Sequence, residues 1–364
     1  MTSHCGSLQR QDLRGRDFVD LTLRNGSWEH CDFRQARFER CTIEAWLVRD
    51  CQLDGARFID CRVQGLDVVE ASFHAVTVEG GLWHDVTITD TSMKGMRLAD
   101  VAMEQWLLLR CALDALAMES CKTTFLTSQA CHGAALTVSQ GQLLDTVWFD
   151  TSLEKACFQN TRIERQVIGG GQWIGPCYRD VEGGLATWHD VRIEALHIHA
   201  PAWRGLRFHR CGLLDTDLRY ACLEHSCGME STFRRVRFDG ASLVQARFDA
   251  SVLIDCRLTG VDAYGSSWRG SELVACDLGN AKLGNSDWRF AQWERCDTAD
   301  IHAPGAHWHG FRRDGTDPRL CSPPDAEDTA LAASQSWRQR YRSETFPQDP
   351  TPMARRRHVQ PSAV

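Results

Sequence analysis

Four side chains of the types that bind transition metals recur at a regular spacing in the middle of the chain. His197 and His199 lie in the stretch EALHIHAPAW, and Cys177 and Asp217 lie twenty residues before and after His197. Thiolate, imidazole and carboxylate groups are the common protein ligands of zinc and related metals. They could converge here only if the chain returned to the same face every twenty residues.

A second group of histidines lies near the end of the ordered pattern, in HAPGAHWHGF, and contains His302, His307 and His309. No CxxC pair occurs anywhere in the sequence to strengthen a metal hypothesis. The alternative is an exposed polar face that contains histidines, and this is the interpretation we adopt for both groups. We therefore predict no metal ion and no other cofactor.

The sequence also lacks the motifs of nucleophilic or phosphate chemistry. The triple glycine at 169–171 is not followed by the lysine and helical pattern of a phosphate-binding loop. Serine, histidine and acidic residues are plentiful, but none lies in a recognisable nucleophile motif. We predict no catalytic residues and a protein that is not an enzyme; an enzyme that uses a surface metal is the remaining alternative.

The apolar residues of CDFRQARFERCTIEAWLVRDCQLDGARFIDCRV, residues 31–63, fall at every fifth position. They are Phe33, Phe38, Ile43, Val48, Leu53, Phe58 and Val63. A helix repeats its apolar side chains at three and four residues and a half-buried strand at two, so neither explains this spacing. A smaller residue two positions before most of the large ones, such as Cys31 or Ala36, fits a short extended piece followed by a corner.

This five-residue frame continues from position 13 to position 308 without an insertion or deletion. It contains 60 positions, of which 52 carry a large apolar side chain. The exceptions are Thr123, Ser128, Gly133, Gly183, Gly228, Ala263, Thr298 and Ala303. Self-similarity of this length predicts a solenoid whose repeats contact only their neighbours.

The segments CDFRQARFERC, DGASLVQARF and CDLGNAKLGNSDW resemble the pentapeptide-repeat family, whose loose motif is A-(D/N)-L-X-X. The resemblance implies an all-β fold, a right-handed quadrilateral β-helix in which four pentads form one coil of twenty residues. The 60 pentads then give about 15 coils, and a ladder spacing of ~4.8 Å gives a rod roughly 70 Å long. The chain departs from the motif by using Cys, Val, Ser and Thr at the small position and Trp or Phe at the large one, which preserves the size class.

Cysteine is frequent at the small inward position. The chain has 17 cysteines, and eleven of them follow the frame, namely Cys31, Cys41, Cys51, Cys61, Cys111, Cys121, Cys131, Cys211, Cys256, Cys276 and Cys296. We interpret them as reduced thiols that fill the space of an alanine or serine in the core. Metal binding by cysteines one coil apart, such as Cys31 with Cys51, or Cys256 with Cys276 and Cys296, is the alternative.

Three places in the frame predict local irregularity. Trp46 and Trp106 occupy small positions, and we expect crowding to push them or their neighbours outward. Successive exceptions in the frame predict a weak or distorted zone at 123–133, either a kink or a recognition feature. Pro176 and Pro201 predict a second irregular zone at 165–205, because proline removes a backbone donor.

The domain organisation follows from where the frame begins and stops. We predict an N-terminal cap segment at 1–12, the β-helix at 13–311, and a linker, helix and tail at 312–364. The segment DAEDTALAASQSWRQRY predicts a capping helix over about 325–343, with Asp325 as its N-cap and an apolar stripe that includes Trp337 and Tyr341. This stripe would cover the last coil or dock on a partner, and the proline-rich tail with its three arginines is expected to be disordered.

The N-terminal residues MTSHCGSLQRQDLRGRDF are polar, and no apolar run approaches the ~18 residues of a membrane span. We therefore expect a cytoplasmic protein without a signal peptide, with non-classical secretion left open. Arg355, Arg356 and Arg357 in the tail are interpreted as solvated charge, with nucleic-acid or partner binding as the alternative, so direct nucleic-acid binding is not expected.

The resemblance implies two kinds of function. Well-understood family members resemble duplex DNA in size and acidity and bind type II topoisomerases, such as gyrase, at the DNA site. Here the residues from 309 onward hold nine arginines and seven acidic residues, which leaves −9 for the rest of the chain, a thin charge for about 15 coils. We therefore favour a non-enzymatic scaffold that binds another protein along a rod face or at its C-terminal end. Large members of the family resemble accessory or effector components of bacterial secretion systems, particularly of type VI, and the resemblance implies such a role here.

Overall fold

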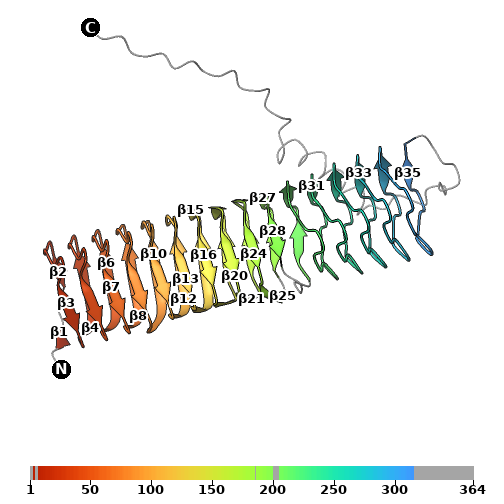
Figure 1. Cartoon of the computed structure of the whole chain (residues 1–364). Helices are drawn as coiled ribbons and strands as arrows, with labels where there is room; N and C mark the ends of the chain where they lie inside the picture. The colour runs from red at the N-terminus through yellow and green to blue at the C-terminus, as the bar shows by residue number, and fades with distance from the viewer. Residues whose placement is uncertain (1–2, 5–6, 185, 200–204, 315–364) are drawn as a thin grey trace, which may run out of the picture. The chain divides into compact units, whose positions relative to one another are not determined.

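The structure is a computed structural model that describes residues 3–4, 7–184, 186–199 and 205–314. These residues form 35 β-strands in three parallel sheets, and none of them lies in a helix. Figure 1 shows the strands stacked coil upon coil, from β1 (Ser3–His4) to β35 (Arg312–Arg313). Within the described part there is consequently no helix of the length and apolarity that a membrane span requires.

The first sheet has fifteen strands and covers two faces of the coils. Its first part uses strands of eight residues that run across a corner, and after β14 it divides into two rows of three-residue strands. The strands are β1, β2 (Leu8–Gln9), β4 (Thr22–Glu29), β6 (Thr42–Arg49), β8 (Arg62–Val69), β10 (Leu82–Thr89), β12 (Ala102–Leu109), β14 (Lys122–Gln129), β17 (Gln142–Leu144), β18 (Val147–Phe149), β21 (Arg162–Glu164), β22 (Val167–Gly169), β25 (Glu182–Gly184), β26 (Thr187–His189) and β29 (Arg207–His209).

The second and third sheets have ten strands each. The second sheet contains β3 (Asp17–Val19), β5 (Arg37–Glu39), β7 (Arg57–Ile59), β9 (Thr77–Glu79), β11 (Arg97–Ala99), β13 (Ala117–Glu119), β16 (Thr137–Ser139), β20 (Cys157–Gln159), β24 (Cys177–Arg179) and β28 (His197–His199). The third contains β15 (His132–Ala134), β19 (Ser152–Glu154), β23 (Gln172–Ile174), β27 (Arg192–Glu194), β30 (Gly212–Leu214), β31 (Thr232–Arg234), β32 (Val252–Ile254), β33 (Glu272–Val274), β34 (Gln292–Glu294) and β35.

The coil repeats every twenty residues. Phe18 pairs with Phe38, and Phe38 pairs with Phe58, in parallel register. Isolated bridges keep the same offset where the strands are too short to count as a sheet. The predicted all-β parallel solenoid of about 15 coils is therefore confirmed.

The corners explain why the period is five. Every described fifth residue from 10 to 310 has a positive φ, and the non-glycine residues among them lie between 47° and 62°. At a representative corner the amide of Ala36 donates to the carbonyl of Phe33 (3.0 Å), and Gln35 between them has φ 60°, the geometry of a type II turn. Three extended residues and a left-handed corner make one side of the coil.

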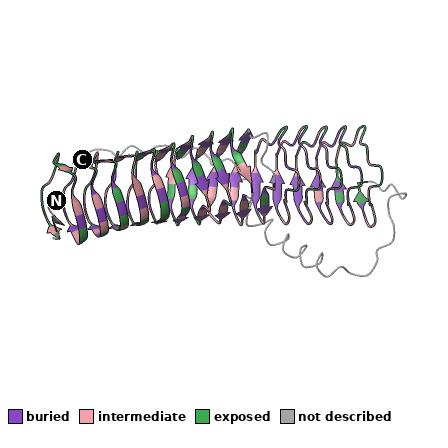
Figure 2. Ribbon diagram, turned by 90° about the horizontal axis from the view of Figure 1, so that it is seen from below, coloured by how far each residue is buried: buried purple, intermediate pink, exposed green. Residues whose placement is uncertain are grey.

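The interior is filled by the inward side chains that the frame predicts. Purple strand segments alternate with exposed ones along the column in Figure 2, as expected when successive side chains point to opposite faces. Aromatic rings stack between coils, for example Phe38 on Phe58 (centroids 4.7 Å apart) and Trp268 on Trp288 (4.9 Å). The eleven inward cysteines are free thiols, and all but Cys296 are buried.

The expectation that Trp46 and Trp106 would be displaced outward is wrong, because each is only 2% exposed. Trp46 lies on β6, an eight-residue strand in register with β4, and its ring lies over Gly26 of the preceding coil. Trp106 is held by a hydrogen bond from its indole nitrogen to the carbonyl of Trp83 (3.1 Å). The coils therefore accommodate the ring of Trp46 because Gly26 has no side chain, and the ring of Trp106 because its indole nitrogen has a buried hydrogen-bond partner.

Where the structure describes them, the predicted irregular zones contain backbone ladders. Thr123 and Ser128 are buried within β14, and Gly133 lies in β15, where the third sheet begins. In the second zone the carbonyl of Pro176 accepts a hydrogen bond from the amide of His197 (3.0 Å), so the ladder continues past the proline. Residues 185 and 200–204, which include Pro201, lie outside the described residues. The predicted capping helix at about 325–343, with Trp337 and Tyr341, and the tail also lie outside them.

Candidate interaction surface

The predicted metal candidates are neighbours along one face of the second sheet. Cys177 pairs with His197, and His197 is bridged to Asp217 in the next coil. His199 lies on β28 in register with Arg179. The twenty-residue spacing therefore places these residues next to one another, as the sequence suggested.

Their arrangement shows no metal-binding geometry. The carboxylate of Asp217 accepts hydrogen bonds from the guanidinium of Arg219, with an Nη2 to Oδ2 distance of 2.7 Å, and from the amide of the same residue. In the second group, His302 lies next to Lys282 and His307 next to Asp287 in the backbone ladder. Across the described ranges, no three His, Cys, Asp or Glu side chains are placed to hold one metal ion.

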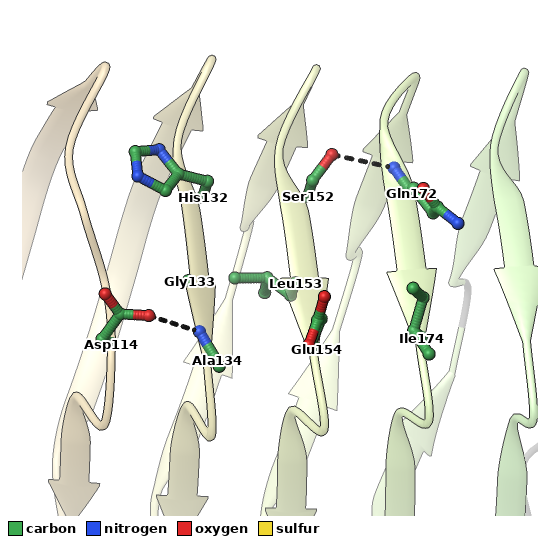
Figure 3. Close-up of a pocket in the computed structure, with 9 residues that line it drawn as sticks. All are labelled: Asp114, His132, Gly133, Ala134, Ser152, Leu153, Glu154, Gln172 and Ile174. Carbon is green, nitrogen blue, oxygen red and sulfur yellow. Dashed lines mark hydrogen bonds between the residues drawn. The ribbon is translucent and has the colours of Figure 1, made fainter. Parts of the chain in front are cut away.

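A shallow depression lies at the start of the third sheet, around Gly133. Its volume is about 360 Å³, and Figure 3 shows the residues that line it, which are Asp114, His132, Gly133, Ala134, Ser152, Leu153, Glu154, Gln172 and Ile174. A Cβ atom at Gly133 would lie 2.7 Å from the carbonyl carbon of Leu113, so only glycine fits this backbone position. The depression marks the place where this face changes from tight turns to three-residue strands.

The polar groups of the depression bind the backbone. The carboxylate of Asp114 accepts a hydrogen bond from the amide of Ala134 (2.9 Å), and the hydroxyl of Ser152 accepts one from the amide of Gln172 (3.1 Å). Figure 3 shows no hydrogen bond between His132 and either of these side chains. Nucleophilic catalysis requires a nucleophile within hydrogen-bond reach of its base, and these nine residues do not provide that pair.

Carboxylates at the corners are paired with arginines one coil away. Asp90 accepts two hydrogen bonds from Arg110, at 2.7 Å and 2.6 Å, and Asp190 accepts two from Arg210, at 2.8 Å and 2.7 Å. The same bidentate arrangement joins Asp20 to Arg40, Asp145 to Arg165 and Asp215 to Arg235. Each pair holds an aspartate against the guanidinium that neutralises it.

A second kind of pair forms within single pentads. Asp12 and Asp32 each accept hydrogen bonds from the arginine two residues later, and the guanidinium of Arg14 lowers the pKa of Asp12 to about 2. The hydrogen bond from Arg110 likewise holds the pKa of Asp90 below its ordinary value. Much of the acidic charge of the column is therefore offset locally by arginine.

One face of the first sheet has no Asp, Glu, Lys or Arg side chain over six coils. We call it the uncharged face and define it by two columns of outward residues, which are Thr87, Leu107, Thr127, Val147, Val167 and Thr187 in the first and Thr89, Leu109, Gln129, Phe149, Gly169 and His189 in the second. They form two columns on β10, β12, β14, β18, β22 and β26, in continuous parallel register. Five ladder steps of ~4.8 Å make this face roughly 24 Å long.

Two aromatic side chains are exposed at this face. Phe149 is 42% exposed near its middle, and Phe125 is 55% exposed at the corner that leads into β14's second half. Phe125 has φ 57°, a conformation that costs energy for a bulky residue. Phe125 therefore exposes an apolar ring beside the uncharged face.

Ion pairs border the uncharged face on both sides. Asp90 and Arg110 lie at one edge, and Asp145 and Arg165 lie at the other, on the corner column that also holds Phe125. An apolar centre with a polar rim is the usual composition of a protein–protein interface.

Sequence reasoning missed this surface, although the signal was available. The frame was used to select inward residues, whereas the face becomes visible when outward residues are compared at intervals of twenty. Leu107, Val147 and Val167 then fall in one column with threonines and no charged residue.

A family model agrees with the repeat. The family model described as pentapeptide repeats matches residues 231–267 in eight copies. No curated protein matches the chain significantly. Among solved structures, the chain is similar to the pentapeptide repeat protein Rfr23 from the cyanobacterium Cyanothece 51142, at 16% identity over 31% of this chain and 60% of that protein, with a TM-score of 0.16.

Two further solved structures match over most of their length. HetL from the cyanobacterium Nostoc sp. strain PCC 7120, a pentapeptide repeat protein involved in heterocyst differentiation regulation, is 14% identical over 85% of this chain and 92% of its own, with a TM-score of 0.14. QnrB1, a plasmid-mediated fluoroquinolone resistance protein, is 12% identical over 82% of this chain and 91% of its own, with a TM-score of 0.15.

Proposed function

We propose that the chain, which belongs to the pentapeptide-repeat family, is a non-enzymatic scaffold. It binds another protein through the uncharged face. The observation that carries the proposal is the pair of columns without Asp, Glu, Lys or Arg over six coils, with exposed Phe125 and Phe149 and a rim of ion pairs. Exposed aromatic residues at the centre of a rimmed patch are typical binding hot spots.

The chemistry of the rim favours a protein as the occupant. A membrane surface attracts faces rich in lysine and arginine, and so does nucleic acid. Here Arg110 is paired with Asp90 and Arg165 with Asp145, so the rim presents both signs of charge in balance. A partner with an apolar, largely uncharged patch of its own would fit this surface best.

The alternative function is a DNA mimic that binds a type II topoisomerase such as gyrase. A mimic needs dense negative charge along one face. The Asp–Arg pairs reduce that charge at the corners, and the uncharged face interrupts it over six coils. These observations favour the scaffold over the mimic.

A role as an accessory or effector component of a bacterial secretion system, of the type VI kind, is a narrower form of the scaffold proposal. It rests only on the resemblance of large pentapeptide-repeat proteins to such components. Under this form the partner would be a secretion-system protein in a bacterial cytoplasm.

The proposal is tested by identifying a partner and then measuring direct binding. The full chain is used to recover proteins from its native host, and each recovered protein is purified and titrated against the full chain by calorimetry. The proposal predicts one saturable complex between the two purified proteins. If instead light scattering shows that the chain alone forms a dimer that covers this face, the occupant is a second copy and the proposal is wrong.

A further inference from the structure

Two cysteines lie next to each other on the outer side of the second sheet. Cys157 on β20 pairs in register with Cys177 on β24. The residues that follow them, Phe158 and Tyr178, are buried and stack in the core with ring centroids 4.8 Å apart. Because successive side chains in a strand point to opposite faces, both thiols point outward, and both are half-buried.

This pair differs from the other described cysteines. The in-register pairs Cys31 with Cys51 and Cys111 with Cys131 lie at inward positions and are buried.

Two more half-buried cysteines face outward without a cysteine neighbour. Cys222 is bridged to Ser242, and Cys227 to Arg247. Among the described residues, Cys157 and Cys177 are therefore the outward cysteines that are aligned with each other, and Cys222 and Cys227 are natural controls.

We propose that Cys157 and Cys177 form an oxidisable dithiol, which closes to a disulfide between adjacent coils when the protein meets a peroxide or a low-molecular-weight disulfide. Paired residues of parallel strands have Cα atoms ~4.8 Å apart, which falls within the range that a disulfide spans. The backbone consequently needs little movement to close the bond. Burial and the neighbouring Cys177 thiol raise the pKa of Cys157, as expected for two sulfur atoms in close proximity.

The chemistry balances with a peroxide as the oxidant. One thiol attacks the peroxide oxygen, which forms a sulfenic acid and releases one molecule of water or alcohol. The second thiol then attacks the sulfenic sulfur, and the disulfide forms with loss of a second water. The two sulfur atoms together lose two electrons and two protons, which reduce the peroxide bond.

The disulfide would tie two coils together across a loop of twenty residues. Such a link restrains local opening more than global unfolding in a repeat protein, because each coil contacts only its neighbours. Oxidation would therefore stiffen this part of the column, independently of whether a protein partner binds elsewhere.

The experiment uses the full chain with Cys5 and Cys321, which lie outside the described residues, changed to serine. The folded protein is treated with hydrogen peroxide or glutathione disulfide, then unfolded in a slightly acidic denaturant that contains N-ethylmaleimide, so that buried thiols are blocked as they become exposed, and digested with trypsin. Cleavage after Arg162 and Arg165 separates the two cysteines, so a linked peptide with a mass deficit of about 2 Da identifies the disulfide. The Cys177→Ser variant is the control for the linked peptide.

We expect the linked peptide to contain Cys157 and Cys177, while Cys222 and Cys227 remain blocked by N-ethylmaleimide or carry glutathione alone. Hydrogen exchange in β20 and β24 should slow about tenfold on oxidation and stay unchanged in Cys177→Ser. The proposal is overturned if Cys157 and Cys177 stay free thiols, or carry separate glutathione groups, under conditions in which Cys222 is modified.

Discussion

The ring of Trp46 occupies the space that a side chain at Gly26 would need. The two residues pair in register on β4 and β6, and a Cβ atom at Gly26 would lie 2.4 Å from Cη2 of Trp46. The first prediction concerns this contact. Gly26→Ala should displace the ring and destabilise the N-terminal coils by about 1–3 kcal/mol, the usual cost of overpacking.

Hydrogen exchange of β4 and β6 under increasing urea measures this loss locally. Trp46→Leu in the Gly26→Ala background should recover part of the loss, since the shorter side chain leaves room for the new methyl group. Gly15→Asn is the matched control, because Gly15 has φ 62° and no atom within 4 Å of a Cβ, and asparagine tolerates that conformation. Equal exchange in Gly26→Ala and the parent protein would show that the contact is not tight.

The corner ion pairs predict a particular dependence of stability on pH. The hydrogen bond from Arg110 lowers the pKa of Asp90, and Arg210 does the same for Asp190. A carboxylate whose pKa is lower in the folded state stabilises the fold above its unfolded pKa, near 3.8, and this contribution disappears as the pH falls through the folded pKa.

Melting temperatures of the parent protein and of Asp90→Asn combined with Asp190→Asn provide the measurement. The variant should melt lower at neutral pH, and the difference should shrink steadily below pH 3.8. High salt should reduce the difference as well, because the pairs are near the surface. A difference that stays constant from neutral to acidic pH would mean that the charges are not the cause.

The offset of acidic charge by arginine predicts the outcome of a gyrase assay. A mimic of duplex DNA should inhibit supercoiling, or protect the enzyme from a quinolone, at micromolar concentration. We expect neither effect from the full chain, with relaxed and supercoiled plasmid resolved on agarose gels. Inhibition that is relieved by added linear DNA would instead establish the mimic.

The C-terminal segment remains a prediction from sequence. In the last described coil, Ile301 and Trp308 are only partly buried at the edge of the core. A cover over these residues would stabilise that end of the solenoid. Deletion of residues 325–343, or Trp337→Ala with Tyr341→Ala, should lower the melting temperature and the solubility of the chain, and unchanged values for both variants would remove the capping hypothesis.

The sequence was sufficient to predict the column because the inward position repeats at a fixed period. Residues such as Phe38 and Trp268 are buried where the frame places them. Trp46 was mispredicted because the frame treats every corner as equal, whereas the structure runs an eight-residue strand across this one and removes the side chain beneath it. Whether a large side chain fits at an inward position therefore depends on the residue twenty positions away, which a single pentad does not reveal.

The candidate surface was harder to predict for a related reason. The metal candidates were found because their residue types attract attention, and the spacing did place Cys177 beside His197. The uncharged face consists of ordinary threonine, leucine and valine residues, whose meaning depends on being neighbours across coils. Only the register of β12, β14 and β18 shows that charge is absent from one continuous area.

Phe125 and Tyr220 allow the most direct test of the proposed binding face. Both are exposed aromatic residues at left-handed corners, with φ 57° and 58°, but Tyr220 belongs to the column of corners that contains Ser120 and Gln140, which does not border the uncharged face. Asparagine suits such corners, so Phe125→Asn and Tyr220→Asn should both fold at least as stably as the parent protein.

The decisive measurement is the affinity of the purified partner for the parent chain, for Phe125→Asn combined with Phe149→Gln, and for Tyr220→Asn, determined by calorimetry at one salt concentration. We predict that Phe125→Asn combined with Phe149→Gln raises the Kd at least about tenfold, the effect of losing one or more hot-spot contacts, while Tyr220→Asn leaves it unchanged. An unchanged Kd for the Phe125 and Phe149 variant, with its melting temperature intact, would contradict the account.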